Sequence, residues 1–241
     1  SRPELVVEAV RSGRVSEERI DQSVRRLLRE KFVLGLFDQP FLEVDRAVAT
    51  IGRADFVAEG EAAQRAAIVR LTAADSGPAA LPLAGDQAIY VENMARAAAT
   101  RLGKVVEDPA DADLAVLRIN APYEPRPGGF ESFFHAGSLE FAPQERERIV
   151  AICRQVPTIV VLFLDRPAIV PEIANAAAAL LVEFGARDDA VADVLLGAAQ
   201  ARGRLPFDLP SSMKAVAESR SDVPFDTGDP LFRFGDGILS S

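Results

Sequence analysis

The sequence predicts an α/β fold, a three-layer αβα sandwich with a mostly parallel sheet of about five or six strands, preceded by helices and a linker. Three observations support this class. Apolar segments of strand length alternate with helix-length amphipathic segments after residue 55. The strand segments are apolar at nearly every position, as in parallel sheets that are buried on both faces. A length of 241 residues with 49% hydrophobic content is sufficient for a large core.

The first 37 residues have helical periodicity. A short helix is predicted over residues 3–12, because apolar residues recur at helical spacing and Gly13 suits the position after a helix end. A second helix starts after Ser16, a favourable N-cap residue, and continues toward Phe37. Pro40 forbids its continuation. Residues 38–54 are therefore interpreted as a linker, extended over residues 41–54.

The remaining chain, residues 55–241, alternates between the two kinds of element. Helix and strand types follow from the length and periodicity of each segment. The predicted order is helix 56–71, strand 88–92, helix 94–102, strand 104–107, strand 114–119, helix 143–154, strand 158–164, helix 167–175, strand 179–184 and helix 188–196.

Two irregular segments interrupt this pattern. Residues 120–141 form a loop rich in Pro, Gly and aromatic side chains directly after a strand, and loops of this length are uncommon unless they are functional. Open α/β sheets bind ligands at the carboxyl ends of their strands, which is where this loop begins. Residues 210–241 are predicted to be a tail packed on a neighbouring element.

Composition excludes several classes of function. A net charge of −9 disfavours nucleic acid as a partner, because it repels phosphate backbones. The apolar segments are shorter than the roughly 20 residues of a membrane-spanning helix, so no membrane partner is expected. Cys153 is the single cysteine, is interpreted as inert core filling, and favours a cytoplasmic location.

Common catalytic and cofactor motifs are missing from the sequence. There is no Walker-type loop, no Gly-x-Gly-x-x-Gly after a strand, no Cys-x-x-Cys, no His-Glu-x-x-His and no Gly-x-Ser-x-Gly. We therefore predict no cofactor and no metal site.

Carboxylate chemistry in loop 120–141 is the remaining candidate. Carboxylates beside aromatic rings suit sugars, because rings stack on pyranose faces and apolar surroundings raise a carboxyl pKa toward general-acid duty. Solvated surface glutamates are the simpler alternative. The candidates are the carboxylates Glu124, Glu131 and Glu140 and the neighbouring side chains Tyr123, Arg126, Phe130, Phe133, Phe134 and His135.

Three aspartates near predicted helix starts are given structural interpretations. Asp165 precedes Arg166 and Pro167 at a strand end, and we interpret it as a helix cap in preference to a ligand contact. Asp188 and Asp189 are interpreted as cap and dipole partners of the following helix.

Several strings in fixed order resemble glycoside hydrolase family 3. Each string is weak alone, but together they cover nearly the whole chain. They are GRVSEERID at 13–21, KFVLGLF at 31–37, AIVRL at 67–71, LPL at 81–83, DRP at 165–167, ADVLLG at 192–197, GRLPF at 203–207 and LFRFGDG at 231–237.

The resemblance implies a division of labour between two domains. Two-domain members of the family join a TIM barrel, which carries an Asp nucleophile, to an α/β sandwich whose loop commonly supplies a Glu acid/base. By this resemblance, residues 1–37 are the last helical piece of the barrel, 38–54 the linker and 55–241 the sandwich. The barrel's tryptophan-containing nucleophile motif is not in this chain, which has no Trp. The implied partners are a carbohydrate substrate and that barrel domain.

The resemblance also implies candidate site residues. Family loops resemble Gly-Glu-x-x-Tyr-x-Glu, whereas this loop has the sequence APYEPR at positions 121–126. Alignment on Tyr123 favours Glu124 as the catalytic acid/base over its rival Glu131. Tyr123, Arg126, Phe133 and His135 are the corresponding candidates for substrate binding.

Two alternatives remain open at this stage. The domain could be a non-catalytic scaffold or sugar-binding module, or a freestanding flavodoxin-like module, which the missing phosphate loop disfavours. An exposed apolar cluster at Val33, Leu34, Leu36 and Phe37 would indicate a missing neighbour or a homo-oligomer.

Overall fold

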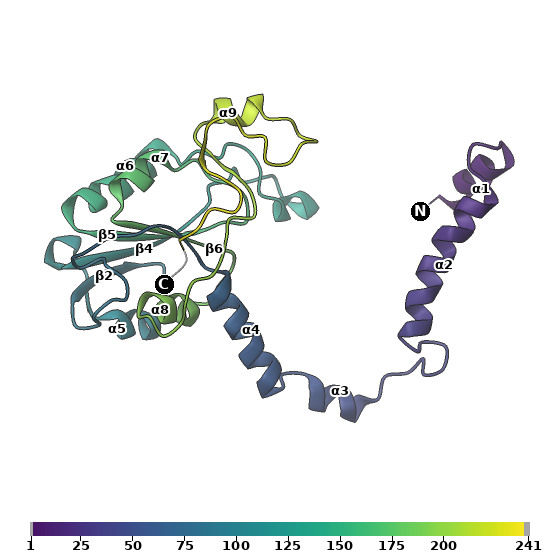
Figure 1. Ribbon diagram of the computed structural model, residues 1–241, viewed down its shortest axis with the longest axis horizontal. Coiled ribbons are helices and arrows are strands. Elements are labelled where there is room, and N and C mark those ends of the chain that lie inside the picture. The colour runs from purple at the N-terminus through teal and green to yellow at the C-terminus, as the bar shows by residue number, and fades with distance from the viewer. Residues whose placement is uncertain (1, 239–241) are drawn as a thin grey trace. The chain divides into compact units, whose positions relative to one another are not determined.

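The computed structural model describes residues 2–238 and divides into two compact units, residues 1–57 and 58–241. Figure 1 shows the elements of both. Each unit is described by itself. Within residues 2–238, no helix combines the length and apolarity needed to span a membrane.

The first unit consists of helices without a core of their own. It holds α1 (Pro3–Arg11), α2 (Glu17–Val33), α3 (Val44–Thr50) and the start of α4 (Ala54–Ala67), and none of these four helices has a buried residue. The Ser16 hydroxyl accepts a hydrogen bond from the Arg19 amide at 3.2 Å, which confirms the predicted N-cap. Residues 44–50 are helical, so the extended conformation expected over 41–54 is wrong there.

The second unit contains a six-stranded sheet in the order β1-β6-β5-β4-β2-β3, which confirms the predicted fold class. All neighbouring strands are parallel except β1, which pairs with β6 in the antiparallel sense. The strands are β1 (Val69–Thr72), β2 (Ala88–Glu92), β3 (Lys104–Val106), β4 (Leu114–Asn120), β5 (Thr158–Phe163) and β6 (Ala179–Glu183).

Strand β1 corrects the helix predicted over residues 56–71. The helix ends at Ala67, and Val69 to Thr72 instead pair with β6, with Val69 fully buried. The apolar spacing of this segment satisfies both periods over a few residues, and pairing with a sheet edge decides between them.

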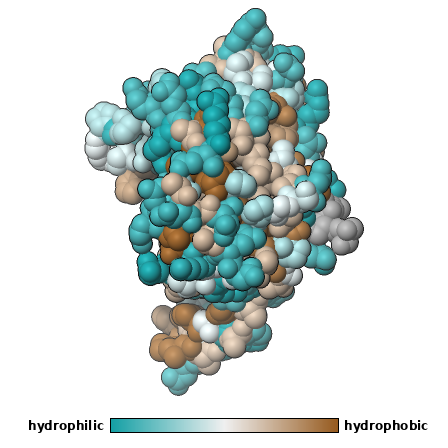
Figure 2. All heavy atoms as spheres, turned by 90° about the vertical axis from the view of Figure 1, so that its left-hand side faces the viewer, coloured by the Kyte–Doolittle hydropathy of each residue, from teal (hydrophilic) through white to brown (hydrophobic). Residues whose placement is uncertain are grey.

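Helices cover both faces of the sheet, as Figure 1 shows. One face carries α6 (Pro143–Gln155) and α7 (Pro171–Ala176), and the other carries α5 (Arg96–Leu102) and α8 (Asp188–Leu195). Each face has its own apolar core, and β4, β5 and β6 contribute to both. The outer surface in Figure 2 is hydrophilic over most of the visible face, with apolar residues interspersed.

The chain after α8 returns along β1. The Gly203 amide donates to the Ile68 carbonyl, and the Ile238 amide donates to the Arg70 carbonyl at 2.7 Å. The segment also forms a small sheet of β7 (Leu209–Pro210) and β8 (Pro230–Phe232) and the short helix α9 (Met213–Glu218). Two 3₁₀ turns, Pro109–Asp111 and Gly129–Phe133, complete the elements.

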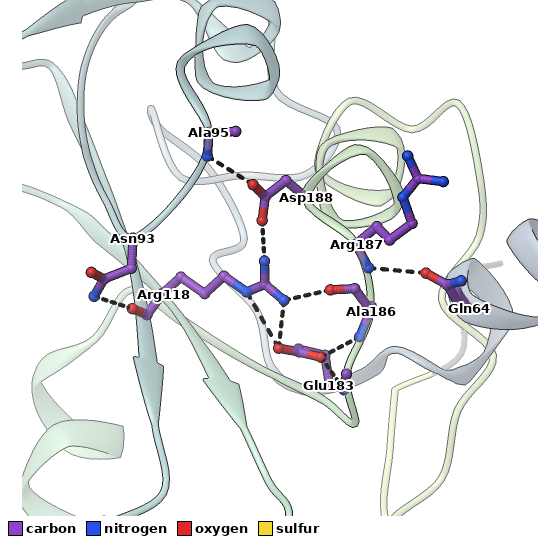
Figure 3. Close-up of polar contacts among 9 residues, drawn as sticks. Gln64, Asn93, Ala95, Arg118, Glu183, Ala186, Arg187 and Asp188 are labelled. Carbon is purple, nitrogen blue, oxygen red and sulfur yellow. Dashed lines mark hydrogen bonds and ion pairs between the residues drawn. The ribbon is translucent and has the colours of Figure 1, made fainter.

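A buried ion pair fixes the carboxyl ends of β4 and β6 (Figure 3). The Arg118 guanidinium on β4 donates to Glu183 at the end of β6 at 2.8 Å, and the Glu183 side chain is fully buried. The other Glu183 oxygen accepts from the Gly185 and Ala186 amides, each at 2.6 Å. All of the charge on Glu183 is therefore matched by donors.

Asp188 joins this network and corrects its interpretation as a cap. Its carboxylate accepts from the Ala95 amide at 2.7 Å and pairs with Arg118, and the N-cap position of α8 is Arg187, with no side-chain cap bond. Asp189 pairs with Arg101 at 3.3 Å, although both aspartates do lie in the acidic first turn of α8.

Replacing Glu183 should destabilise the fold strongly. Glu183→Ala leaves the Gly185 and Ala186 amides without an acceptor and removes one of the acceptors of Arg118, which keeps Asp188 and the Ala186 carbonyl. We expect a loss of about 3–5 kcal/mol in the free energy of unfolding by urea titration. The control is Glu107→Ala, because Glu107 is 91% exposed and 3.7 Å from Arg96, and its effect should stay within about 0.5 kcal/mol. Equal losses for both variants would contradict this account.

Candidate functional site

A cavity of about 580 Å³ opens at the carboxyl end of β4, where sequence analysis placed a binding site. Loop 120–141, the start of α6 and the end of β2 enclose it. Its lining residues are Asn93, Ile119, Asn120, Ala121, Pro122, Tyr123, Glu124, Ser138, Glu140, Phe141, Ala142 and Glu145. The position follows from the parallel sheet, since strand ends and the loops after them meet at one edge.

The base of the loop is closed on itself and then attached to the chain after β5. The Glu124 amide donates to the Ala136 carbonyl at 2.9 Å in an isolated antiparallel bridge. The Ile169 amide donates to the Leu139 carbonyl at 2.9 Å, and the Arg166 guanidinium donates to the Gly137 carbonyl at 2.8 Å. Backbone contacts therefore hold the returning half of the loop in place.

This attachment corrects the helix predicted over residues 167–175. Residues 168–170 lie along the loop, with a parallel bridge between Glu140 and Ile169, and α7 starts only at Pro171. Ala168 and Val170 are buried here as in a strand.

Glu124 lies at the cavity with its carboxylate beside the returning chain. Its Oε1 accepts from the Ser138 amide at 3.0 Å. Gly137 leaves the space that this side chain occupies, because a Cβ at that position would approach the Glu124 carboxyl carbon to 2.2 Å. The loop thus holds Glu124 by one hydrogen bond and by a glycine that gives it room.

Glu131 lies on the outer part of the loop. It belongs to the 3₁₀ turn Gly129–Phe133, its side chain is 71% exposed, and it pairs with Arg126 at 3.8 Å. Neither residue of this pair lines the cavity. An exposed ion pair of this kind is weak. The structure therefore brings Glu124, and not Glu131 or Arg126, to the cavity wall.

The aromatic candidates also fall into two groups, one at the cavity and one outside it. Tyr123 lines the cavity, and its ring stacks on the His135 ring with centroids 3.7 Å apart and an interplanar angle of 6°. Phe133 is 81% exposed at the loop tip, where Phe130 and Phe134 form an edge-to-face pair at 5.2 Å. The tip is an exposed aromatic surface outside the cavity.

Asp165 has a different role from the helix cap expected of it. No helix starts beside it, and its carboxylate pairs with the His135 ring nitrogen Nδ1. Sequence reasoning missed this contact because the two residues are 30 positions apart. The only signal was the location of Asp165 at a strand end.

Asn93, after β2, and Glu145, on α6, also line the cavity, and Glu145 belongs to an ion-pair network whose other members lie outside the lining. Arg148 donates to Glu92 at 2.7 Å and to Glu145 at 2.8 Å, and its hydrogen bonds hold the pKa of Glu145 below its ordinary value. The Tyr90 hydroxyl donates to Glu92, and this bond, with burial, raises the pKa of Tyr90 to about 12. Glu145, Asn93 and Asn120 were not singled out from the sequence.

The arrangement offers a carboxylate, an aromatic face and amide side chains around one opening. Such a wall suits a hydroxyl-rich ligand, because hydroxyls both donate and accept hydrogen bonds. Among residues 2–238 there is no cluster of three or more His, Cys, Asp or Glu side chains that could hold a metal ion.

The sequence matches the model of the glycosyl hydrolase family 3 C-terminal domain over residues 18–239. The chain belongs to glycosyl hydrolase family 3. It is 47% identical to the beta-glucosidase C of Emericella nidulans over 98% of its length, and 36% identical to the periplasmic beta-glucosidase/beta-xylosidase of Dickeya chrysanthemi. It covers 38% and 36% of those two proteins, so it corresponds to one part of longer relatives.

Solved structures support the fold of this family 3 domain. The beta-glucosidase from Listeria innocua in complex with glucose superposes with a TM-score of 0.69 at 21% identity, covering 97% of this chain and 40% of that one. At this identity the likeness concerns the fold alone.

Substituting Gly137 should disturb the base of the loop. Gly137 has a φ of +81°, and an added methyl group would collide with the Glu124 side chain, so Gly137→Ala should lower the free energy of unfolding by about 1–2 kcal/mol. Gly128→Ala is the matched control in the same loop, because Gly128 has a φ of −49° and open space around its Cα. Urea titrations in which Gly128→Ala costs as much would refute the assignment.

Because the pKa of Tyr90 is raised in the folded protein, the domain should lose stability at alkaline pH. A pKa raised from 10.0 to about 12 means that the folded protein keeps this proton longer than the unfolded chain, so the contribution is complete below pH 10 and is lost as pH rises toward 12. Unfolding free energies measured from pH 9 to 11.5 should fall less steeply for Tyr90→Phe than for the parent. Identical slopes would count against the Tyr90–Glu92 bond.

Proposed function

We propose that this chain is the second domain of a retaining β-glycosidase that hydrolyses β-linked glucosides or related sugars. The observation that supports this most is the cavity at the end of β4, where Glu124 and Tyr123 lie side by side in a family 3 domain. The names of the relatives favour β-glucosides and β-xylosides as the substrate class.

In this proposal Glu124 is the catalytic acid/base. A retaining enzyme needs two carboxyl groups about 5–5.5 Å apart, one as nucleophile and one as acid/base. Glu124 would protonate the oxygen of the leaving group, and after the glycosyl-enzyme forms it would take a proton from the attacking water. The nucleophile would be an Asp of the barrel domain, so this chain alone would be inactive.

Exposed apolar residues in the first unit support the proposal that a barrel domain packs against it. Val33, Leu34, Leu36 and Phe37 at the end of α2 are 78%, 71%, 44% and 56% exposed. Apolar side chains gathered in this way mark a surface that is covered by another protein element. We propose the preceding barrel domain as that element, with a second copy of the chain as the less favoured alternative.

A scaffold role is the second candidate function. Its support is that the Glu124 carboxylate is held by the Ser138 amide, as a residue that merely stabilises the loop would be. In that case another domain supplies the acid. A cytoplasmic location stays a prediction from the single cysteine, and the name of the Dickeya relative places that protein in the periplasm.

The test compares four proteins in glycoside assays: this chain alone, the protein that also carries the barrel domain, and Glu124→Gln and Glu131→Gln in the latter. We expect no turnover by the chain alone. Glu124→Gln should lower kcat/KM for alkyl β-glucosides by about 10²–10⁴, with smaller losses on dinitrophenyl glucosides and rescue by azide. Glu131→Gln should stay within a few-fold of the parent.

The other outcomes each contradict a part of the proposal. Ordinary enzyme rates from the chain alone would refute the need for a barrel. A loss confined to Glu131→Gln would transfer the acid role to Glu131. Near-normal rates for both variants would favour the scaffold.

A further inference from the structure

Three side chains from two segments form a continuous contact beside the cavity. Asp165, after β5, pairs with Nδ1 of His135, and the His135 ring stacks on Tyr123, which lines the cavity. The side chains of His135 and Asp165 are 34% and 31% exposed, so the pair is partly shielded and still reachable from solvent. No step assigned to Glu124 uses Asp165 or His135.

The pair with Asp165 determines which ring nitrogen of His135 carries the proton. An ionised carboxylate has only acceptors, so Nδ1 must donate to it. In the neutral imidazole this leaves Nε2 without a proton and with a free lone pair. Among residues 2–238, no side chain or backbone group bonds to Nε2.

The stacked tyrosine fixes the plane of the same ring. With centroids 3.7 Å apart and planes within 6°, the His135 ring cannot tilt without losing the contact with Tyr123. The hydrogen bond fixes rotation within that plane. Two independent contacts therefore give Nε2 a defined direction, which a solvated loop histidine lacks.

We infer that Asp165 is a positioning residue that holds His135 so that Nε2 accepts a hydrogen bond from a sugar hydroxyl. This inference rests on the proposed glycosidase function and deepens it: His135 does not itself line the cavity but stacks on Tyr123, which does, so its ring would extend the site beyond the cavity wall. Sugar hydroxyls are suitable donors, and an acceptor beside an aromatic face matches the mixed polar and apolar surface of a pyranose.

The first test is spectroscopic and needs no activity. His135 is the only histidine of the chain, so its two ring ¹⁵N resonances are unambiguous. At pH 8.5 the parent should show a protonated Nδ1 and an unprotonated Nε2. Asp165→Ala should lose this preference. An unprotonated Nδ1 in the parent, or an unchanged spectrum in Asp165→Ala, would overturn the inference.

The second test is a double-mutant cycle in the protein that carries the barrel domain, with an aryl β-glucoside as substrate. Asp165→Ala and His135→Phe, which keeps a ring on Tyr123, should each raise KM about tenfold with little change in kcat, as expected for one lost binding contact. If Asp165 acts through His135, the double variant should be no worse than either single variant, within about twofold.

The control for these kinetics is Glu107→Ala, an exposed carboxylate on the far side of β2, which should leave KM and kcat unchanged. Multiplying effects, near a hundredfold in the double variant, would show that Asp165 acts independently of His135 and would overturn the inference. A parent without glucosidase turnover would refute the proposed function and the hydroxyl contact together, while the ¹⁵N spectrum would still decide whether Asp165 sets the tautomer.

Discussion

Arg118 and Glu183 form an ion pair at the carboxyl edge of the sheet, where loop 120–141 begins, and the Glu183 side chain is fully buried. Burial of either charge alone would be costly, and the pair is tolerated because Glu183 receives donors on both oxygens. These bonds tie the end of β4 to the turn after β6, and Asp188 extends the tie to the turn after β2. The cavity therefore opens on a rigid edge, although its wall is a loop.

The loop itself is ordered by a different means. Its base is bonded to the segment after β5 by the Ile169 amide and the Arg166 guanidinium, and Ile169 forms one isolated parallel bridge with Glu140. Glu124 and Tyr123 lie on this anchored base, whereas Glu131 and Phe133 lie on the exposed tip. Anchored residues can hold a geometry that chemistry needs, whereas the exposed tip contributes no side chain to the cavity wall.

The two units differ in what they can do alone. The sheet unit has an apolar core on each face, whereas helices α1, α2 and α3 of the first unit have no buried residue. A helical segment with exposed Val33 and Leu34 lacks the tertiary packing that stabilises most helices in proteins. This asymmetry agrees with a chain that spans 38% of the length of a relative such as the Emericella enzyme.

The sequence by itself determined the fold class, the family and the location of the candidate site. Strand and helix periods are local, so alternation, the Ser16 cap and the long loop after β4 could all be predicted. The tertiary structure decided what depends on distant partners. Val69 to Thr72 form a strand because they pair with the edge of β6. Residues 168–170 are not helical because Ile169 pairs with Glu140 of the loop. The contact between Asp165 and His135 could not be predicted from the sequence for the same reason. Hydrogen bonds between segments far apart in sequence leave no periodic signal along the chain.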